Sequence, residues 1–497
     1  MKKAIVIGSG FAGLSAASFM ARDGWQVTVL EKQSTAGGRA RSFSAEGFTF
    51  DMGPSWYWMP DVFERYFKQF GFSVKDFYYL QRLDPSYRIY WHDEPMDIPA
   101  DYDQLKKLFE SIEAGSGVKL DKFLKESSYK YETGINKLVY KPGLSLSEFA
   151  DLDLAKGLLK LDVFNSMKSH VQKHFRHPKL RQLLEFPVLF LGALSQHIPA
   201  LYSLMNYADI KLGTWYPEGG MYSIVKAMQK VAEGLGVTFR FNHNVNKVNI
   251  EGNSISSVEA EHNGIKQFFE SDVVICGADY HFFEQSILPE KFRTYTKKYW
   301  EKRVMAPSCL LFYVGINKKL KAVTHHSLFF DVDFEKHGKE IYETAEWPEE
   351  PLFYVCTPSV TDCTVAPHGE ENLFFLIPVA AGLKGDTEEL RNKYFDMIIS
   401  RFENLTGEII KENIIYKKSY AITNFVNDYN SFKGNAYGLA NTLMQTSIMK
   451  PSLKSKKVGN LYFTGQLTVP GPGVPPSLIS GEVTAKTINT YFKNSDK

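Results

Sequence analysis

Apolar residues at the start of the chain are grouped in a pattern that predicts one strand, one helix and a second strand. Residues 3–7 form a short apolar run, residues 8–13 are rich in glycine, and small residues continue to residue 22. A second apolar run at residues 26–30 ends at the acidic residue Glu31. Short apolar runs bounded by glycine are typical of buried parallel strands, so we expect a βαβ unit here.

The glycine-rich segment predicts a nucleotide site. Its spacing, Gly8-x-Gly10-x-x-Gly13, is a fingerprint of dinucleotide binding when it joins a strand to a helix. Gly8 allows the tight turn, Gly10 lets the backbone approach a pyrophosphate, and Gly13 lets the helix pack closely on the strand. The helix N-terminus offers free N–H groups to the phosphates, and Glu31 can accept hydrogen bonds from ribose hydroxyls. The alternative is a glycine-rich connection that holds no ligand.

A second glycine pair extends this site. Gly37 and Gly38 are followed by Arg39, and this extension is not part of the general fingerprint. Gly38 permits close backbone approach, while the Arg39 cation can compensate the charge of a pyrophosphate. The alternative is an ordinary surface turn.

Strand and helix patterns recur in the middle of the chain. Residues 87–99 predict a hairpin, and residues 101–205 have helical spacing without strand alternation. Residues 386–405 predict a further helix, whereas residues 421–438 are polar, aromatic and rich in turn residues. The strands expected after residue 217 span residues 237–241, 248–258, 264–270, 272–276, 308–316 and 371–379.

The end of the chain repeats the order of strand, glycine-rich turn and helix. Gly465 follows the apolar residues 461–463, and Gly473 precedes a helix expected from about residue 478 to 492. Pro475 suits the first turn of that helix. We interpret this as a second helix N-terminus directed at the ligand, where its dipole would stabilise negative charge on a reduced ring. The alternative is a helix that only completes the fold.

These patterns predict an α/β protein with a Rossmann-type, doubly wound domain that is discontinuous. Nucleotide-fold signals lie at both ends and in the middle, so other parts must be inserted between them. We expect also an α+β substrate domain and a helical insertion. The expected boundaries are 1–75, 217–290 and 455–497 for the nucleotide domain, 76–100 and 291–454 for the substrate domain, and 101–216 for the helical insertion.

Composition excludes several classes of protein. The 497 residues carry a net charge of +2, which gives no case for nucleic acid as a partner. The four cysteines form no C-x-x-C pair, so we interpret them as free thiols in a reducing compartment. No apolar run approaches the ~20 residues that span a bilayer, so we expect no transmembrane segment. The glycine fingerprint falls inside the first apolar run, which argues against a secretory signal there.

Two clusters have both a structural and a functional interpretation. Trp56, Tyr57 and Trp58 are bulky and not periodic, so they predict either a buried loop or the wall of an apolar ligand tunnel. Asp61 is expected to cap the helix that follows. The densest histidine cluster lies at residues 174–177, where a surface position is favoured over a metal site.

A basic-biased segment next to an apolar one raises the question of membrane binding. Seven cations lie between residues 156 and 181, and residues 183–194 are almost wholly apolar. Such a pair can dock on an anionic membrane, or it can be a solvated helix face beside a core helix. The cations are Lys156, Lys160, Lys168, Lys173, Arg176, Lys179 and Arg181.

The sequence resembles the bacterial carotenoid desaturases of the phytoene desaturase family, within the FAD-dependent amine oxidase-like superfamily. The matching stretches are residues 8–13, 31–41, 48–55, 215–221 and 462–481. The run from Gly465 to Pro476 is the most specific, because it is similar to the carotenoid-desaturase signature and not to amine oxidases. Many better-known members have Thr-Val-Ile where this chain has Ser55-Trp56-Tyr57, which leaves the exact substrate open.

The resemblance implies non-covalent FAD, a lipid-soluble polyene substrate and peripheral association with the inner, cytoplasmic face of the cell membrane. It raises the weight of the membrane interpretation for the helical insertion. Trp56, Tyr57, Trp58 and Trp215 are expected to line the substrate site. No metal ligand is assigned. The residues expected to contact FAD are Gly8, Ser9, Gly10, Phe11, Ala12, Gly13, Glu31, Lys32, Gly38, Arg39, Gly53, Pro54, Ser55, Val245, Gly277, Ala278, Gly465, Gln466, Gly473, Val474 and Pro475.

The implied reaction is removal of two hydrogens from adjacent carbons of an acyclic carotenoid, with hydride transfer to flavin N5. No catalytic side chain or general base is assigned, although aromatic faces such as Trp56 could stabilise an allylic cation. Stepwise desaturation of phytoene toward lycopene and 3,4-desaturation of a 1′-hydroxycarotenoid both fit the patterns. Further alternatives are a carotenoid isomerase or oxygenase, another amine oxidase-like flavoenzyme, and a non-catalytic lipid escort protein. The terminal electron acceptor, oxygen or quinone, stays open.

Overall fold

The first sheet of the protein is parallel and contains the expected βαβ unit. The computed structural model describes residues 1–145, 148, 161–189 and 191–495. Along the chain, α1 (Phe11–Arg22) connects β1 to β2, which pair side by side. The five strands, in spatial order, are β19 (Leu461–Phe463), β13 (Val273–Cys276), β1 (Lys3–Ile7), β2 (Gln26–Leu30) and β9 (Thr238–Arg240).

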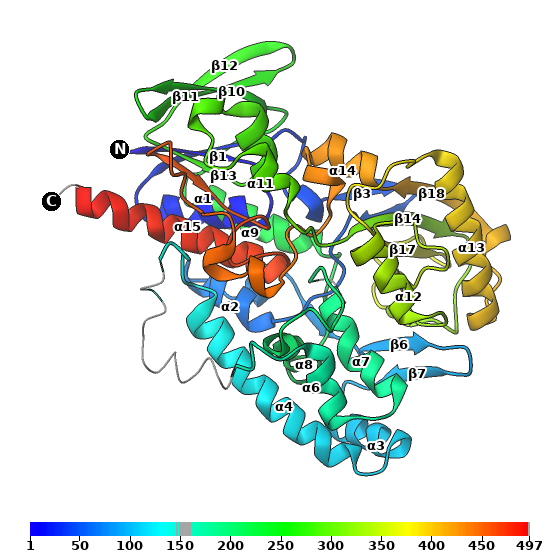
Figure 1. Ribbon diagram of the computed structural model, residues 1–497. Coiled ribbons are helices and arrows are strands. Elements are labelled where there is room, and N and C mark those ends of the chain that lie inside the picture. Colours follow the sequence, from blue (N-terminus) through cyan, green and yellow to red (C-terminus); the bar gives the residue numbers. More distant parts are fainter. Residues whose placement is uncertain (146–147, 149–160, 190, 496–497) are drawn as a thin grey trace.

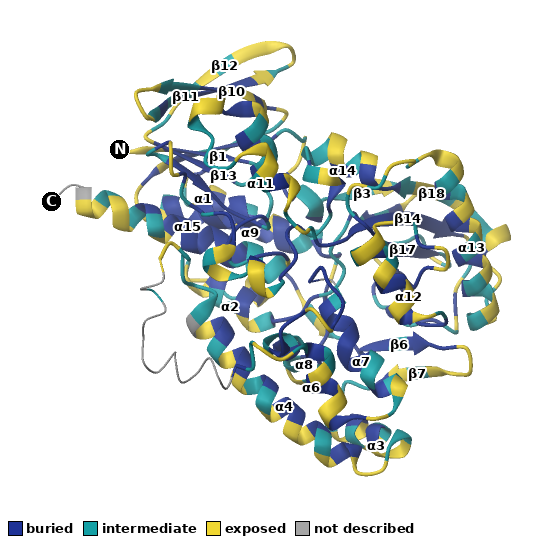
Figure 2. Ribbon diagram, in the orientation of Figure 1, coloured by how far each residue is buried: buried dark blue, intermediate teal, exposed yellow. Residues whose placement is uncertain are grey.

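Three helices from distant parts of the sequence pack together beside this sheet (Figure 1). They are α1, α9 (Tyr222–Gly234) and α15 (Val474–Ser495). A Cβ atom on Gly481 would lie 2.4 Å from the Ala12 carbonyl oxygen, so glycine is what allows α15 to approach α1 so closely. Ser15 Oγ also donates to the Leu478 carbonyl at 2.7 Å. The core of this domain therefore includes nearly all of α1, which Figure 2 shows as buried.

A second, larger sheet carries the hydrophobic strands of the remaining chain. One face is covered by α13 (Glu388–Thr406), where Phe395 packs on Phe312 of β14 with ring centroids 5.0 Å apart. The sheet is mixed, because β6 runs parallel to β15 while the other pairs are antiparallel. In spatial order its strands are β18 (Ile414–Tyr420), β14 (Ser308–Ile316), β17 (Glu371–Val379), β16 (Phe353–Cys356), β15 (His326–Phe329), β6 (Tyr87–Tyr90) and β7 (Pro95–Ile98).

A helical region joins the two sheets at the lower part of Figure 1. A short strand pair, β5 (Leu80–Arg82) with β8 (Trp215–Pro217), closes the two ends of this region. The helices described within it are α3 (Tyr102–Ile112), α4 (Ser116–Thr133), α6 (Met167–His174), α7 (Pro178–Leu189) and α8 (Leu204–Tyr207).

The structure differs from the expected elements in three places. The run predicted as one strand over residues 248–258 is a hairpin, because Gly252 has φ +61° and turns the chain. The segment described as polar and turn-rich contains a helix, α14 (Ile422–Tyr429). The helix predicted to have Asp61 as its cap is α2 (Pro60–Lys68), preceded by Met59, and Asp61 instead accepts a hydrogen bond from the Tyr131 hydroxyl.

Smaller sheets complete the molecule. The hairpin just described belongs to a three-stranded antiparallel sheet that projects outward near the first sheet, as Figure 1 shows. The strands are β10 (Asn244–Glu251), β11 (Ser254–His262) and β12 (Ile265–Glu270), and a separate pair is β3 (Ser42–Ala45) with β4 (Phe48–Asp51).

Candidate functional site

The carboxyl ends of four parallel strands meet at one edge of the first sheet. Ile7 is in register with Leu30 on one side and with Cys276 on the other, and Cys276 is in register with Phe463. After each strand, the first or second residue is one that the sequence predicted to contact the ligand. Ligands of doubly wound folds bind outside the carboxyl ends of the strands, so this edge is the candidate site.

The first glycine turn has the geometry that phosphate binding requires. A Cβ on Gly13 would lie 2.0 Å from the Gly8 carbonyl oxygen, so only glycine lets α1 begin this close to the strand. Gly8 itself has φ +91° and packs against Gly277 and Ala278. In contrast, a Cβ on Gly10 would meet no atom within 4 Å, which leaves open space in front of the helix. No side chain caps the N-terminus of α1, so its N–H groups are available to an anion.

Glu31 is held in place at the end of β2. Its Oε2 accepts hydrogen bonds from the Ser9 backbone N–H at 2.8 Å and from Ser9 Oγ at 2.7 Å. Its Oε1 accepts from the Gln33 N–H at 2.8 Å. Val245 is buried in the same hydrophobic cluster as Leu30, the last residue of this strand. Lys32 was also expected to contact the cofactor. Its Nζ donates instead to the Asn427 carbonyl near the end of α14.

The second glycine pair and Arg39 close the cradle from the other side. A Cβ on Gly38 would lie 3.3 Å from Gly10 Cα, so the two glycine segments touch. A Cβ on Gly53 would lie 2.8 Å from the Arg39 carbonyl, which brings the turn at residues 53–55 to the same place. Arg39 Nη2 donates to Ser431 Oγ at 2.9 Å and to the Asn435 carbonyl at 3.1 Å.

The Arg39 guanidinium has a hydrogen-bond donor that an anion could use. Its Nε is buried without a hydrogen-bond partner among the described residues, and Asp279, the carboxylate that interacts with it electrostatically, lies beyond ion-pair distance. Burial lowers the pKa of this guanidinium, yet arginine stays charged in proteins. A negatively charged group bound beside this cation would be stabilised by it. The residues present therefore fit a dinucleotide with a pyrophosphate, as FAD has.

The C-terminal loop joins this cradle. Gly465 has φ +103°, and a Cβ there would meet only the Ala12 side chain, at 3.6 Å. Gly473 has φ +113°, and α15 begins directly after it with Val474 and Pro475. Gln466 lies beside Asn435, one of the partners of Arg39. The first and last motifs of the sequence are therefore parts of one site.

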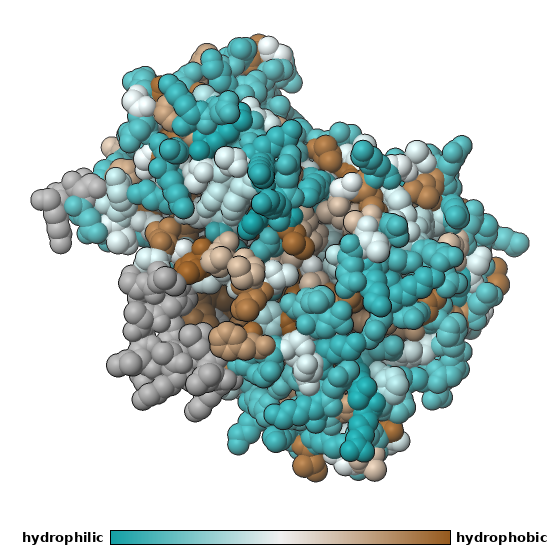
Figure 3. Space-filling model, viewed as in Figure 1, coloured by the Kyte–Doolittle hydropathy of each residue, from teal (hydrophilic) through white to brown (hydrophobic). Residues whose placement is uncertain are grey.

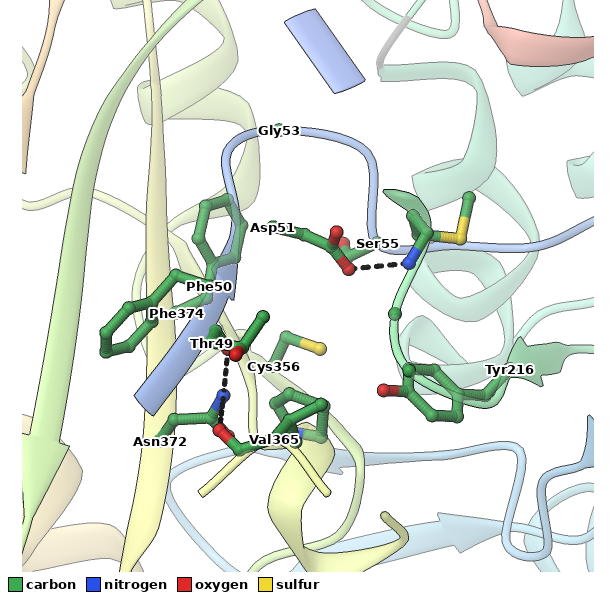
Figure 4. Close-up of a pocket in the computed structure, with 14 residues that line it drawn as sticks. Thr49, Phe50, Asp51, Gly53, Ser55, Tyr216, Cys356, Val365, Asn372 and Phe374 are labelled. Carbon is green, nitrogen blue, oxygen red and sulfur yellow. Dashed lines mark hydrogen bonds between the residues drawn. The ribbon is translucent and has the colours of Figure 1, made fainter. Parts of the chain in front are cut away.

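Beyond the cradle lies a small cavity of about 20 Å³ that Figure 4 shows in close-up. Asp51 Oδ2 accepts from the Met221 N–H at 2.6 Å, and Oδ1 accepts from the Tyr222 N–H at 3.1 Å. Burial raises the pKa of Asp51 to about 7. This carboxyl holds the start of α9 against the turn at residues 53–55, so it connects two of the family-like stretches. Sequence analysis missed it, although an acid before Gly53-Pro54 was a visible signal.

The aromatic cluster is divided between two environments. Trp56 stacks on His326 with ring centroids 4.1 Å apart and an interplanar angle of 10°. Tyr57, expected to line the substrate site, instead points into the core, where it stacks on Phe63. Alternate residues of an extended segment face opposite sides, which explains the separation. The other rings close to Trp56 are Trp58, Tyr87, Phe186 and Tyr354.

Two hydrogen bonds fix the remaining tryptophans expected at this site. Trp58 Nε1 donates to Thr214 Oγ1 at 2.8 Å, and that hydroxyl donates to the buried Asp209. Trp215 Nε1 donates to the Leu212 carbonyl at 2.8 Å. Both rings are thereby anchored to the end of the helical region.

Two expectations about the helical region are wrong. His174, favoured as a surface residue, is 6% exposed and packs against Phe123. The described residues of the apolar segment 183–194 are nearly all buried, so this segment offers little surface to a membrane. Of the nearby cations, Lys168 pairs with Glu335 and Lys179 with Asp93, whereas Lys156 and Lys160 lie outside the described residues.

Comparison with known proteins identifies the family. The model of the flavin containing amine oxidoreductases matches residues 11–489. A carotenoid 3,4-desaturase from Haloarcula japonica is 40% identical over 487 residues, which cover 97% of each chain. This chain belongs to the carotenoid desaturases within that family. A zeta-carotene-forming phytoene desaturase from Myxococcus xanthus is 29% identical, covering 99% of this chain and 94% of its own.

Solved structures agree with the fold. An oxidoreductase from Methanosarcina mazei superposes with a TM-score of 0.63 at 15% identity, covering 97% of this chain and 100% of its own. Membership makes the protein a flavin-dependent oxidoreductase, and the cradle described above fits FAD. When bound there, FAD supplies a ring that accepts hydride. No helix among the described residues is long and apolar enough to cross a bilayer.

Proposed function

We propose that this protein introduces conjugated double bonds into an acyclic carotenoid. The desaturases named above are similar along their whole length, and the wall around Trp56 is built of aromatic rings. Such a wall suits a conjugated hydrocarbon. In each step one hydrogen leaves as hydride to the cofactor, its neighbour leaves as a proton to water, and a carbon–carbon double bond forms.

The residues around the cradle have distinct parts in this proposal. Arg39 and the free N–H groups of α1 hold the pyrophosphate. The face of Trp56 stabilises positive charge that develops beside the polyene. The packed rings around it keep water from adding to that charge, while the proton is lost to water at the neighbouring carbon.

Expression in bacteria that accumulate phytoene tests this function. We expect the wild-type chain to convert colourless phytoene to coloured carotenoids, seen by pigment chromatography. A Trp56→Leu variant should retain FAD but convert about 10-fold less, because a desolvated cation–π contact contributes up to about 2 kcal/mol. Unchanged phytoene, together with no activity on any other acyclic carotenoid, would contradict the proposal.

A second candidate is 3,4-desaturation of a hydroxylated carotenoid, and a pair of buried polar atoms favours it. Lys450 Nζ and Asn441 Oδ1 have no hydrogen-bond partner among the described residues, and both side chains are buried. A Cβ on Gly471 would lie 2.9 Å from Asn441 Oδ1 and 3.2 Å from Lys450 Nζ, so both atoms lie against the glycine-rich loop. A hydroxyl both accepts and donates, so it could satisfy the two together.

This candidate makes a clear prediction about selectivity. Wild type should prefer a hydroxylated carotenoid over the hydrocarbon of equal length, because a site built for a hydroxyl leaves its own groups unpaired with the hydrocarbon. Lys450→Met should remove that preference while it leaves turnover of the hydrocarbon intact. If Lys450→Met instead lowers FAD content, the lysine contacts the cofactor and this candidate is refuted. Equal turnover of both carotenoids by wild type would also refute it.

We propose further that the protein docks on the cytoplasmic face of the cell membrane through an apolar patch. The patch comprises Leu144, Val304, Leu443, Met444 and Met449, each at least 45% exposed. Val304 N–H donates to Gln445 Oε1, and Gly143 packs against Ser447, so these segments are neighbours. Figure 3 shows hydrophobic residues gathered around a hollow on this side of the molecule. Exposed apolar patches of this kind often mark membrane sites.

Co-sedimentation with lipid vesicles tests the patch. We expect binding to vesicles of neutral and anionic phospholipid, and a loss of about 10-fold for Met444→Glu because one buried apolar side chain contributes roughly 1.5–3 kcal/mol. Ile265→Glu is the matched control, since Ile265 is 65% exposed on the distant β12. An equal loss in both variants would contradict the patch.

Reoxidation of the reduced protein by oxygen and by a vesicle-dissolved quinone then identifies the electron acceptor.

A further inference from the structure

Two histidines and one cysteine meet inside the second sheet. His326 on β15 and Cys356 on β16 are direct cross-strand partners, and His325 immediately precedes β15. Each of the three side chains brings one potential ligand atom within 4.8 Å of the others. All three are buried, with exposed fractions of 3%, 0% and 4% for His325, His326 and Cys356. Neither the flavin cradle nor the proposed reaction uses this cluster.

The two imidazoles have hydrogen bonding that is typical of metal ligands. His325 Nδ1 lies 2.9 Å from Thr361 Oγ1, and His326 Nδ1 lies 2.6 Å from the Tyr354 hydroxyl. Because Tyr354 donates its own proton to Ser55 Oγ, His326 Nδ1 is the donor in this pair. The Nε2 atoms of both histidines are buried without any partner. Metal-binding histidines donate their other ring N–H to an oxygen in this way.

Two carboxyl groups interact electrostatically with the cluster, Asp362 with His325 and Asp51 with Cys356. A bound cation would stabilise the charged form of each. A second cluster of potential ligands, Glu126 with His170 and His174, also has carboxylates, but it faces a lysine as well. There Lys130 Nζ lies 3.4 Å from His170 Nε2 and would repel a metal ion.

We propose that His325, His326 and Cys356 bind Zn²⁺. Nitrogen and thiolate ligands in this number are typical of zinc, and the thiol loses its proton on coordination. Cys356 also lines the cavity of about 20 Å³ described above, which has room for a water molecule as the fourth ligand. The ion would hold β15 to β16 and, through the ring of His326, fix Trp56. The proposal does not depend on which carotenoid is the substrate.

Metal analysis of the flavin-loaded protein tests this site. After growth with zinc and dialysis against a weak chelator, we expect about one zinc per chain, as for a site with three protein ligands. X-ray absorption should give one sulfur neighbour at about 2.3 Å and nitrogen neighbours at about 2.0–2.1 Å. A His326→Gln/Cys356→Ser variant should lose the metal. Cys363→Ser is the matched control, because Cys363 is the exposed thiol and should keep it.

Three results would overturn the proposal. The first is that wild type neither retains zinc nor takes it up in a titration. The second is that the X-ray absorption data show no sulfur neighbour. The third is that the double variant retains as much zinc as the control. The spectroscopic measurement needs no variant, so it decides the matter even if the double variant fails to fold. Flavin content, recorded for each sample, reports whether the fold is intact.

Discussion

Replacement of Gly10 by alanine should separate cofactor binding from folding. Gly10 has φ −70° and ψ 177°, which any residue adopts, and an added Cβ would meet no atom within 4 Å. Alanine restricts the unfolded chain, which stabilises by about 0.4–1 kcal/mol, but it is a poorer N-cap by a similar amount. These effects offset one another, so the unfolding free energy of the apoprotein should change by less than about 1 kcal/mol.

Binding of FAD should respond far more strongly. The methyl group would occupy the open space that the pyrophosphate needs in front of α1. Overpacking costs about 1–3 kcal/mol, and each lost hydrogen bond to a charged group costs about 1.5–3 kcal/mol. A total of at least about 2.5 kcal/mol corresponds to a loss of affinity of about 70-fold or more.

Two measurements on apoprotein check this reasoning, namely thermal unfolding and titration with FAD followed by flavin fluorescence. Gly234→Ala is the matched control, because Gly234 also has no atom within 4 Å of an added Cβ and lies at the far end of α9. It should leave the FAD affinity unchanged and raise the unfolding free energy by no more than about 1 kcal/mol. If Gly10→Ala bound FAD as tightly as wild type, the phosphates would not pass this glycine and the site would be wrongly placed.

Three further predictions concern stability. Because Asp51 is buried, its pKa is about 7 in the folded protein, against about 3.8 in the unfolded chain. Its contribution to the free energy of unfolding is therefore complete below about pH 4 and is lost as the pH rises to about 7. In Asp51→Asn, the urea midpoint should therefore differ less between pH 5 and pH 8 than it does in wild type. The same difference in both proteins would refute this role of Asp51. Arg391→Met leaves the buried Asp386 without its ion pair and should cost about 3–5 kcal/mol in urea unfolding, whereas the exposed Lys411→Met should cost less than about 1 kcal/mol. Ile398→Ala removes a fully buried side chain beneath the second sheet and should cost about 2–5 kcal/mol; a smaller loss would mean that the core collapses around the site.

The sequence alone determined the parts of this protein that depend on near neighbours. The order of β1, glycine turn, α1 and β2 follows from apolar spacing within thirty residues, and the turn from three glycines whose roles are local. The strands β14 and β17 and the helix α13 could be predicted for the same reason. The glycine-rich C-terminal loop and the start of α15 were also recognisable, because proline and glycine constrain their own backbone.

Only the tertiary structure decided which distant residues meet. Asp51 holds the N–H groups of Met221 and Tyr222, and His326 faces Cys356 because of the register between β15 and β16. A strand pattern predicts two faces but neither the partner nor the register, and a shift of one residue would exchange the faces. The same limit explains why His174 and the segment 183–194 were misplaced, since basic and apolar runs do not reveal what packs over them. Local chemistry thus predicted a dinucleotide site, while long-range packing assembled the cluster that we propose binds zinc.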